Sequence, residues 1–161
     1  MKFSTRRLTF TAAIAAIYVV LTVAFAPLSF GWIQFRVSEA LTILPFFTPL
    51  AIPGLTIGVL IANLYSSAGV LDLIFGPLAT LIAAILTSKI KNKWLAPLPP
   101  VIINAIIIGV MLGVVFSSEV TIPVAMLSVG IGELGVLYTL GLILMFVIER
   151  RAEINKFFKE L

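Results

Sequence analysis

The sequence predicts an all-α integral membrane protein with six transmembrane helices, and three observations lead to this prediction. Of the 161 residues, 61% are apolar and only 11% are charged, and the mean hydropathy is +1.20, whereas a water-soluble domain carries about 25% charged residues. Charge-free runs cover most of the chain. Ten of the eleven basic residues fall in three short clusters between these runs, which is typical of the cytoplasmic flanks of membrane helices.

Each predicted helix follows from a charge-free run, because about 20 mostly apolar residues are needed to cross the hydrocarbon layer. The run 40–71 is too long for one helix and contains Pro45, Pro49 and Pro53, so it is divided into two short helices. Residues 150–161 are expected to continue the last helix into the cytoplasm. The six helices of this single domain, residues 1–161, are predicted near 8–26, 38–50, 53–67, 70–88, 97–116 and 122–149.

The basic clusters predict the orientation in the cell membrane. Six crossings place all three clusters on one side, so the positive-inside rule assigns both termini and the 89–93 loop to the cytoplasm. The apolar runs between the clusters are unsuited to a nucleic-acid surface, despite the net charge of +4. The clusters are Lys2, Arg6 and Arg7; Lys89, Lys91 and Lys93; and Arg150, Arg151, Lys156 and Lys159.

The few charged and amide side chains outside those flanks are the candidate binding residues, because a charge that faces lipid is costly. They include Arg36, Glu39, Asn63, Asp72, Asn104 and Glu133. Glu133 is the strongest candidate. It lies eleven residues after Ile122, which places it roughly 16 Å along the last helix, and the glycines that flank it leave space beside its carboxylate. Intramembrane ionisable groups mark functional sites by default, although a structural Glu in a close helix contact is the alternative.

Each of the other candidates also has a structural interpretation. Asp72 could serve only as an anion at a helix N-terminus, and Asn104 could bond only a neighbouring helix. Arg36 and Glu39 are three residues apart and could pair with each other. Trp32, near the outer face, could either anchor the chain at the interface or stack on a flat ligand.

Small residues at helical spacing form a second pattern, because they let helix backbones approach closely in lipid. Ala12 and Ala16 belong to a stretch that leaves one face of the first helix smooth. Such a face is suited to docking on another membrane protein. With no His and no Cys, the chain also lacks the usual zinc ligands and catalytic nucleophile pairs, so we expect no metal, no cofactor and no enzymatic activity.

Two sequence strings resemble a known family: FRVSEALTILPFF at 35–47 and IANLYSSAGVLDLIFGPLATLIAA at 61–84. They resemble the QueT family of substrate-binding (S) components of energy-coupling factor (ECF) transporters, and the resemblance extends over nearly the whole chain. It implies that the protein binds a queuosine precursor from outside, a 7-deazaguanine such as the 7-aminomethyl compound or queuine. It also implies that Ala12 to Ala16 dock on a transmembrane coupling subunit that works with two cytoplasmic ATPases. The chain itself has no GxxxxGK[ST] phosphate loop.

The candidate residues are chemically compatible with that ligand. A deazaguanine presents adjacent N–H donors to a carboxylate such as Glu133 or Asp72 and a carbonyl oxygen to Arg36 or Asn63. It presents a flat face to Trp32, Phe35 or Tyr65, and in one form an ammonium to Asp72 or Glu39. Three alternatives stay open at this point: an S component for another vitamin such as thiamin, a small proton-coupled exporter that uses Glu133, and a membrane enzyme, which we rank last.

Overall fold

The computed structural model describes residues 5–29 and 35–159, and within these ranges every regular element is helical. This confirms the prediction of an all-α protein. In chain order the elements are α1 (Thr5–Ala24), α2 (Ala26–Ser29), the 3₁₀ helix η1 (Val37–Phe46), α3 (Ala51–Ala62), the 3₁₀ turn η2 (Asn63–Tyr65), α4 (Val70–Thr87), α5 (Leu98–Val115), α6 (Ile122–Val136), the π-helical turn η3 (Leu137–Gly141), α7 (Leu142–Arg150) and α8 (Ala152–Lys159).

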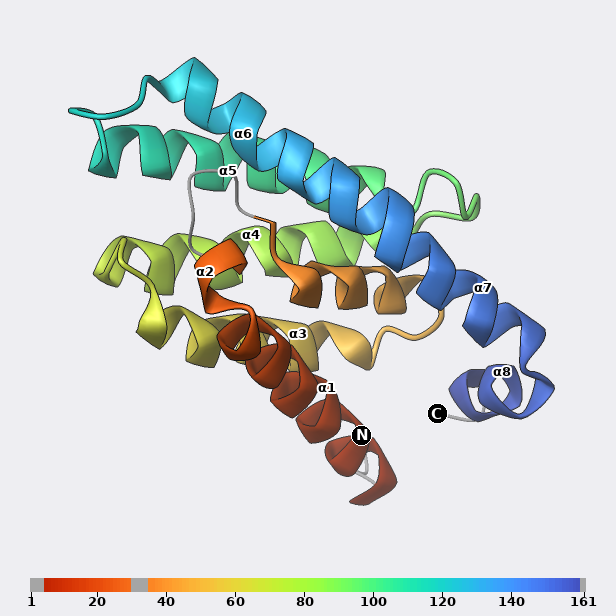
Figure 1. Ribbon diagram of the computed structural model, residues 1–161. Helices are drawn as coiled ribbons and strands as arrows, with labels where there is room; N and C mark the ends of the chain where they lie inside the picture. Colours follow the sequence, from red (N-terminus) through yellow and green to blue (C-terminus); the bar gives the residue numbers. More distant parts are fainter. Residues whose placement is uncertain (1–4, 30–34, 160–161) are drawn as a thin grey trace.

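Four helical segments are long and apolar enough to cross a membrane: α1, α4, α5 and the combined α6–α7, Ile122–Arg150. Two further apolar segments, Val37–Phe46 and Ala51–Tyr65, are shorter. Successive segments run back and forth along the bundle (Figure 1). Large apolar side chains such as Val20 and Leu127 point outward and are about two-thirds exposed, as expected of surfaces that contact lipid.

The segment predicted as a helix near 38–50 is the 3₁₀ helix η1, which ends at Phe46. Pro45 lacks the N–H that an α-helical turn would use, and the Thr42 hydroxyl donates to the backbone oxygen of Glu39 three residues earlier at 2.7 Å. Because a 3₁₀ helix rises about 2.0 Å per residue, ten residues extend about 20 Å. The helix lies inside the bundle, where it contacts α1, α4 and η3.

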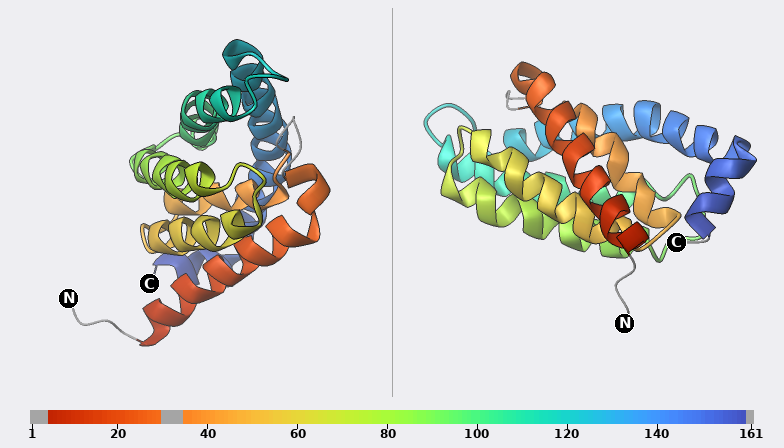
Figure 2. Two further views of the ribbon diagram at one scale, coloured as in Figure 1. Left: turned by 90° about the vertical axis from the view of Figure 1, so that its left-hand side faces the viewer. Right: turned by 90° about the horizontal axis from the view of Figure 1, so that it is seen from below.

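The C-terminal segment differs from the expected straight continuation of the last helix. The π-helical turn η3 interrupts the helix between α6 and α7, and the chain then turns at Arg151, whose backbone is extended. Helix α8 folds back toward the start of α1 (Figure 2). There the Phe158 ring lies 5.6 Å from the ring of Phe10 and 5.8 Å from that of Phe47. Aromatic packing therefore holds α8 against the bundle.

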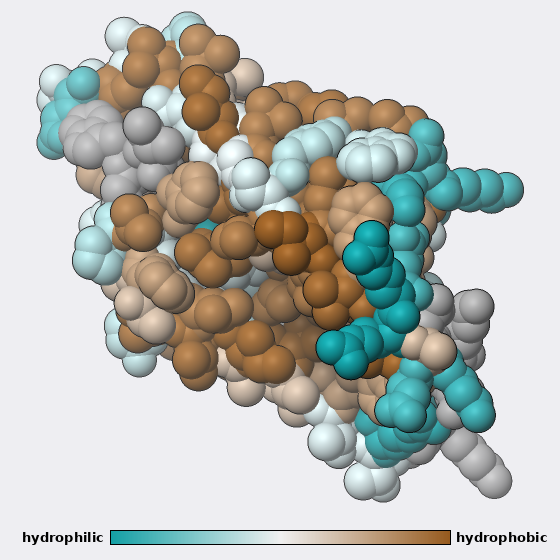
Figure 3. Space-filling view, turned by 45° about the vertical axis from the view of Figure 1, so that its right-hand side comes forward, coloured by the Kyte–Doolittle hydropathy of each residue, from teal (hydrophilic) through white to brown (hydrophobic). Residues whose placement is uncertain are grey.

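The basic clusters gather at one end of the molecule. Lys93 pairs with Glu149 of α7 at 2.8 Å, and the Arg6 guanidinium lies 4.9 Å from the Phe157 ring centre of α8. Hydrophilic side chains accordingly line one edge of the surface, beside a broad apolar face (Figure 3). The described members of the three clusters, far apart in the sequence, thus lie toward one end.

Of the three buried apolar clusters among the described residues, two border the polar region of the bundle. One is built around α1 and α3, with Leu55 and Val59 fully buried. The other is built around α5 and α6, with Ile108 and Val129. Close approach at glycines tightens both: an added Cβ at Gly58 would lie 2.9 Å from Tyr18 Cβ, and one at Gly109 would lie 2.5 Å from Met126 Cα.

Candidate functional site

Four charged residues drawn from distant parts of the chain are buried inside the bundle. Arg36 precedes η1, Glu39 lies within it, Asp72 lies in the first turn of α4 and Glu133 lies in α6. Their exposed fractions are 5%, 3%, 0% and 4%. Ionisable groups inside a membrane bundle are stable only when they face its interior and find polar partners. The hydrogen bonds of each group therefore describe the site.

Arg36 links several elements at one end of the site. Its Nη2 lies 3.4 Å from Asp72 Oδ2, its Nη1 donates to Asn63 Oδ1 at 3.2 Å and its Nε donates to the backbone oxygen of Ser29 at 3.2 Å. The planar guanidinium can reach three acceptors at once because its donors form a rigid fork. It therefore links the end of α2, the end of α3 and the start of α4.

A glycine makes room for the amide of this network. Asn63 Nδ2 donates to the backbone oxygen of Asp72 at 2.9 Å, and a Cβ placed on Gly76 would lie only 2.2 Å from that nitrogen. Asp72 lies at the N-terminal end of α4, where the positive end of the helix dipole stabilises its negative charge. The structural and the binding interpretations of Asp72 are thus compatible.

Glu39 and Glu133 each have one bonded carboxylate oxygen and one without a partner. The hydroxyl of Tyr18 in α1 donates to Glu39 Oε1, and Asn104 Nδ2 of α5 donates to Glu133 Oε1 at 2.7 Å. The second oxygens, Glu39 Oε2 and Glu133 Oε2, are buried without a hydrogen-bond partner, as is Asp72 Oδ1. An unbonded buried carboxylate oxygen costs about 1–3 kcal/mol or more, so these atoms lack the donors that they require.

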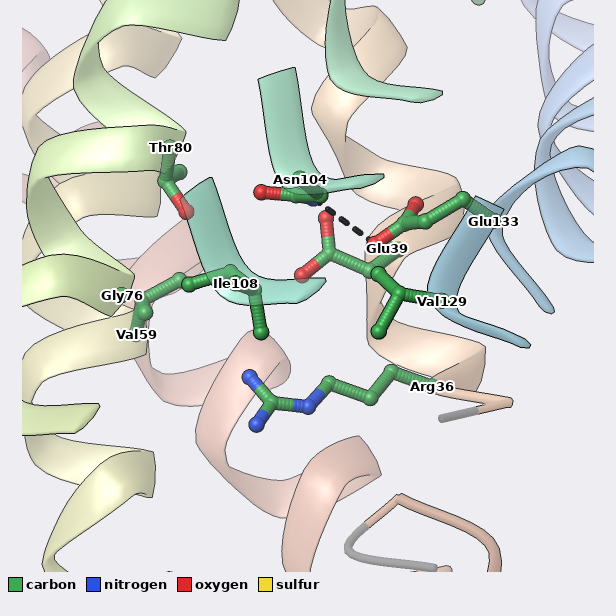
Figure 4. Close-up of a pocket in the computed structure, with 9 residues that line it drawn as sticks. All are labelled: Arg36, Glu39, Val59, Gly76, Thr80, Asn104, Ile108, Val129 and Glu133. Atoms are coloured by element: carbon green, nitrogen blue, oxygen red, sulfur yellow. Dashed lines mark hydrogen bonds between the residues drawn. The ribbon is translucent and has the colours of Figure 1, made fainter. Parts of the chain in front are cut away.

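The side chains converge on a common space (Figure 4): Glu39, Asn104 and Glu133 lie on one side of it, and the Arg36 guanidinium lies on the other. Its volume is about 10 Å³, about the room that one water molecule needs. Pockets that hold small molecules measure about 300 Å³ or more, so this space would hold a small organic molecule only if the lining elements moved apart. The lining residues are Arg36, Glu39, Val59, Gly76, Thr80, Asn104, Ile108, Val129 and Glu133.

The structure brings together Arg36, Glu39, Asn63, Asp72, Asn104 and Glu133 among the predicted binding residues. It does not bring the aromatic candidates into this space. Tyr65 is 66% exposed, and the half-buried Phe35 ring lies against Gly135 of α6. Trp32 lies outside the described residues. Asn104 bonds a neighbouring helix, as the structural alternative proposed, and it also lines the cavity.

Several participating residues did not emerge from the sequence, among them Tyr18, Gly76 and Thr80. Tyr18 carried a usable signal, because a phenol within a transmembrane helix needs a hydrogen-bond partner when it is buried. Gly76 and Thr80 are four residues apart on α4, so they share one helix face with each other. Nothing in their local sequence indicates that this face meets the charged residues.

Comparison with known proteins assigns the family. The QueT transporter family matches residues 8–150. A curated relative, the "Queuosine precursor transporter QueT" of Lactococcus lactis subsp. cremoris (strain MG1363), is 45% identical over 73 residues, which cover 44% of this chain and 43% of that protein's length. No solved structure matches the chain. The family match covers most of the sequence and confirms the resemblance found in its motifs: the chain belongs to the QueT transporter family.

Proposed function

We propose that this chain is the substrate-binding S component of an ECF importer and that its substrate is a queuosine precursor, a 7-deazaguanine such as the 7-aminomethyl compound or queuine. The observation that carries the proposal is the set of buried carboxylate oxygens without partners around one cavity. A deazaguanine offers adjacent N–H donors for such oxygens and a carbonyl oxygen for Arg36 or Asn63.

The cavity walls are suited to a planar ring. Asn104 and Ile108 are four residues apart on α5, and Val129 and Glu133 are four apart on α6, so each polar residue has an aliphatic neighbour one helical turn away. All four line the cavity. Val59 lines it from α3. The ring would lie among these aliphatic side chains while its edges meet Asn104 and Glu133.

We propose that the chain crosses the membrane six times, with η1 and α3–η2 as the two short crossings and with both termini in the cytoplasm. This proposal rests on the grouping of the basic clusters at one end and on the positive-inside rule. The arrangement places Arg36, Asn63 and Asp72 toward the opposite, outer end. Substrate would then enter from outside.

The proposed partner surface lies on α1, on the side away from Tyr18. Ala12 and Ala16 are exposed and border an apolar groove of about 530 Å³ between α1 and α3. Small side chains allow a helix of another membrane protein to approach closely. We assign this groove to the transmembrane coupling subunit, which would in turn bind two cytoplasmic ATPases. The groove residues are Leu8, Thr11, Ala12, Ala15, Ala16, Val19, Val20, Ile57 and Ile61.

The test is equilibrium binding of 7-aminomethyl-7-deazaguanine to the purified full chain, measured by calorimetry with thiamin as a comparison ligand. We expect saturable binding of the deazaguanine and none of thiamin. Glu133→Gln should weaken binding by about tenfold or more, since a hydrogen bond to a charged group contributes about 1.5–3 kcal/mol. Glu119→Gln, which changes an exposed acid in the loop after α5, is the matched control and should bind normally. No saturable binding of any deazaguanine would refute the proposal.

A further inference from the structure

The short helix α8 exposes large apolar side chains at the basic end of the molecule. Ile154 and Phe157 are both 38% exposed, and they share one helix face with Phe158 because residues three and four apart are neighbours on a helix. The half-buried Phe158 ring packs against Phe10 and Phe47. The bundle therefore covers only part of the apolar face of α8.

Basic side chains surround this partly covered face. Arg150 and Arg151 lie at the turn before α8, Lys156 lies on α8 itself, and all three are exposed. The guanidinium carbon of Arg6 in α1 lies 4.9 Å from the ring centre of Phe157. Because eight residues of α-helix extend only about 12 Å, the cations at the start of α8 and the cation beside its end lie over one small area.

Acidic side chains do not balance this positive charge. Glu153 is the one acid in the sequence of α8, residues 152–159. Glu149 of α7 already pairs with Lys93 in the loop between α4 and α5. Clusters of about four or more Lys and Arg residues beside a transmembrane helix are typical of binding sites for anionic lipids.

The path of the chain places α8 across the end of the bundle. Helix α7 ends at Arg151, whose backbone is extended, and α8 then folds back toward the start of α1 (Figure 2). Its exposed apolar side chains thus lie beside the ends of two segments, Thr5–Ala24 and Ile122–Arg150, that are long and apolar enough to cross a membrane. A helix with a basic side and an apolar side in such a position is typical of helices that lie in the membrane interface.

We propose that α8 lies in the membrane interface and binds the headgroups of anionic phospholipids through Arg6, Arg151 and Lys156. Ile154 and Phe157 insert among the neighbouring acyl chains. A lipid fits this surface better than a soluble anion, because a soluble anion has no apolar part that could cover these two side chains. The proposal is independent of the substrate that the transporter binds.

Site-directed spin labelling tests the proposal in the full chain, because the sequence contains no cysteine. Ile154→Cys labels the apolar face, and Ala152→Cys labels a position about 200° away around the helix. Each labelled protein is placed in nanodiscs of phosphatidylcholine alone or of an equal mixture with phosphatidylglycerol. In the mixture, we expect the label at position 154 to collide more with oxygen, which concentrates among acyl chains, than with a water-soluble nickel complex. The label at position 152 should show the reverse, and the label at position 154 should lie less deep in phosphatidylcholine alone.

Charge variants assign the effect to α8. One basic residue near an anionic surface changes an equilibrium constant about fivefold. Arg151→Gln combined with Lys156→Gln should therefore lower the ratio of inserted to released α8 about 30-fold in the mixed membrane. Lys89→Gln combined with Lys91→Gln removes the same charge from exposed positions in the loop between α4 and α5 and should leave the label depth unchanged. High salt should reproduce the effect of the first pair, since it screens the attraction.

Three results would overturn the proposal. A label at position 154 that collides mainly with the nickel complex in both membranes would show that α8 lies in water. Equal depth of that label in the two membranes would show that α8 does not recognise anionic headgroups. Shielding of the label from oxygen and nickel alike would show that a protein surface covers this face instead of lipid. The comparison of two membranes uses one labelled protein, so a folding defect in a charge variant cannot obscure the answer.

Discussion

Replacing Gly76 with alanine perturbs the site through a single methyl group. The new Cβ would lie 2.2 Å from Asn63 Nδ2 and 3.3 Å from Asp72 Oδ1, which forces Asn63 to move. Asn63 is 1% exposed and has hydrogen bonds to Arg36 and to the backbone of Asp72. Overpacking costs about 1–3 kcal/mol, and each buried partner left unbonded costs about 1–3 kcal/mol. We expect a loss of about 2–5 kcal/mol in the free energy of unfolding.

Thermal unfolding in detergent measures this loss, and a second glycine provides the control. For a chain of this size the expected loss corresponds to a melting temperature lower by about 5–15 °C. At Gly130 of α6 an added Cβ would make only an ordinary contact, 3.4 Å from Ala105 Cβ. Gly130→Ala should therefore leave the melting temperature unchanged or raise it slightly, because alanine favours the helix over glycine. Binding of the deazaguanine should weaken about tenfold or more in Gly76→Ala only.

A double-mutant cycle tests whether the effect passes through Asn63. If the methyl acts by displacing that side chain, Asn63→Ala relieves the collision, and the double variant should be about as stable as Asn63→Ala alone. Additive losses in the double variant would refute this explanation. A Gly76→Ala protein as stable as Gly130→Ala would refute the described packing of α4 against Asn63.

Three further predictions concern the rest of the surface. Ala12→Trp should lower uptake by the assembled transporter several-fold and leave substrate binding unchanged, because the ring would fill the groove on α1. The control is Ala13→Trp, which lies on the exposed side of the same helix outside the groove. Equal uptake by both variants would show that the groove is not the docking face. Lys93→Ala removes an ion pair with Glu149 in which each side chain is 33% exposed. The free energy of unfolding should therefore change by less than about 1 kcal/mol, and a larger loss of stability in thermal unfolding would contradict this. Phe158→Ala removes ring contacts that contribute about 0.5–1.5 kcal/mol each and should release α8 from the bundle. The release would be measured as faster tryptic cleavage near the C-terminus. An unchanged cleavage rate would contradict the packing of α8 against Phe10 and Phe47.

Much of the site could be predicted because the chain is so apolar. In a sequence with 11% charged residues, a charge outside the basic clusters must either be buried with partners or face solvent at a loop. The same reasoning selected Arg36, Glu39, Asp72 and Glu133, which the structure brings to one region. The helix boundaries at 70–88 and 97–116 agree with α4 and α5 to within about one residue, because glycine, proline and the basic clusters mark their ends.

The remaining features depend on tertiary contacts that leave little trace in the local sequence. The 3₁₀ form of η1 depends on its enclosure by the surrounding helices as well as on Pro45. The return of α8 depends on Phe158 meeting Phe10, which lies 148 positions earlier in the chain. Stacking by Tyr65 was inferred from residue type alone, and residue type does not reveal that its helix face points outward.

The central claim is that the buried acids and Arg36 form one substrate site, and a structure of the protein with bound 7-aminomethyl-7-deazaguanine tests it most directly. We predict the ring between Val59, Ile108 and Val129, with its N–H edge on Glu133. With ligand bound, the volume of the cavity should be much larger than its present value of about 10 Å³. A ligand bound elsewhere, with Arg36, Glu39 and Glu133 still in their present contacts, would contradict the account.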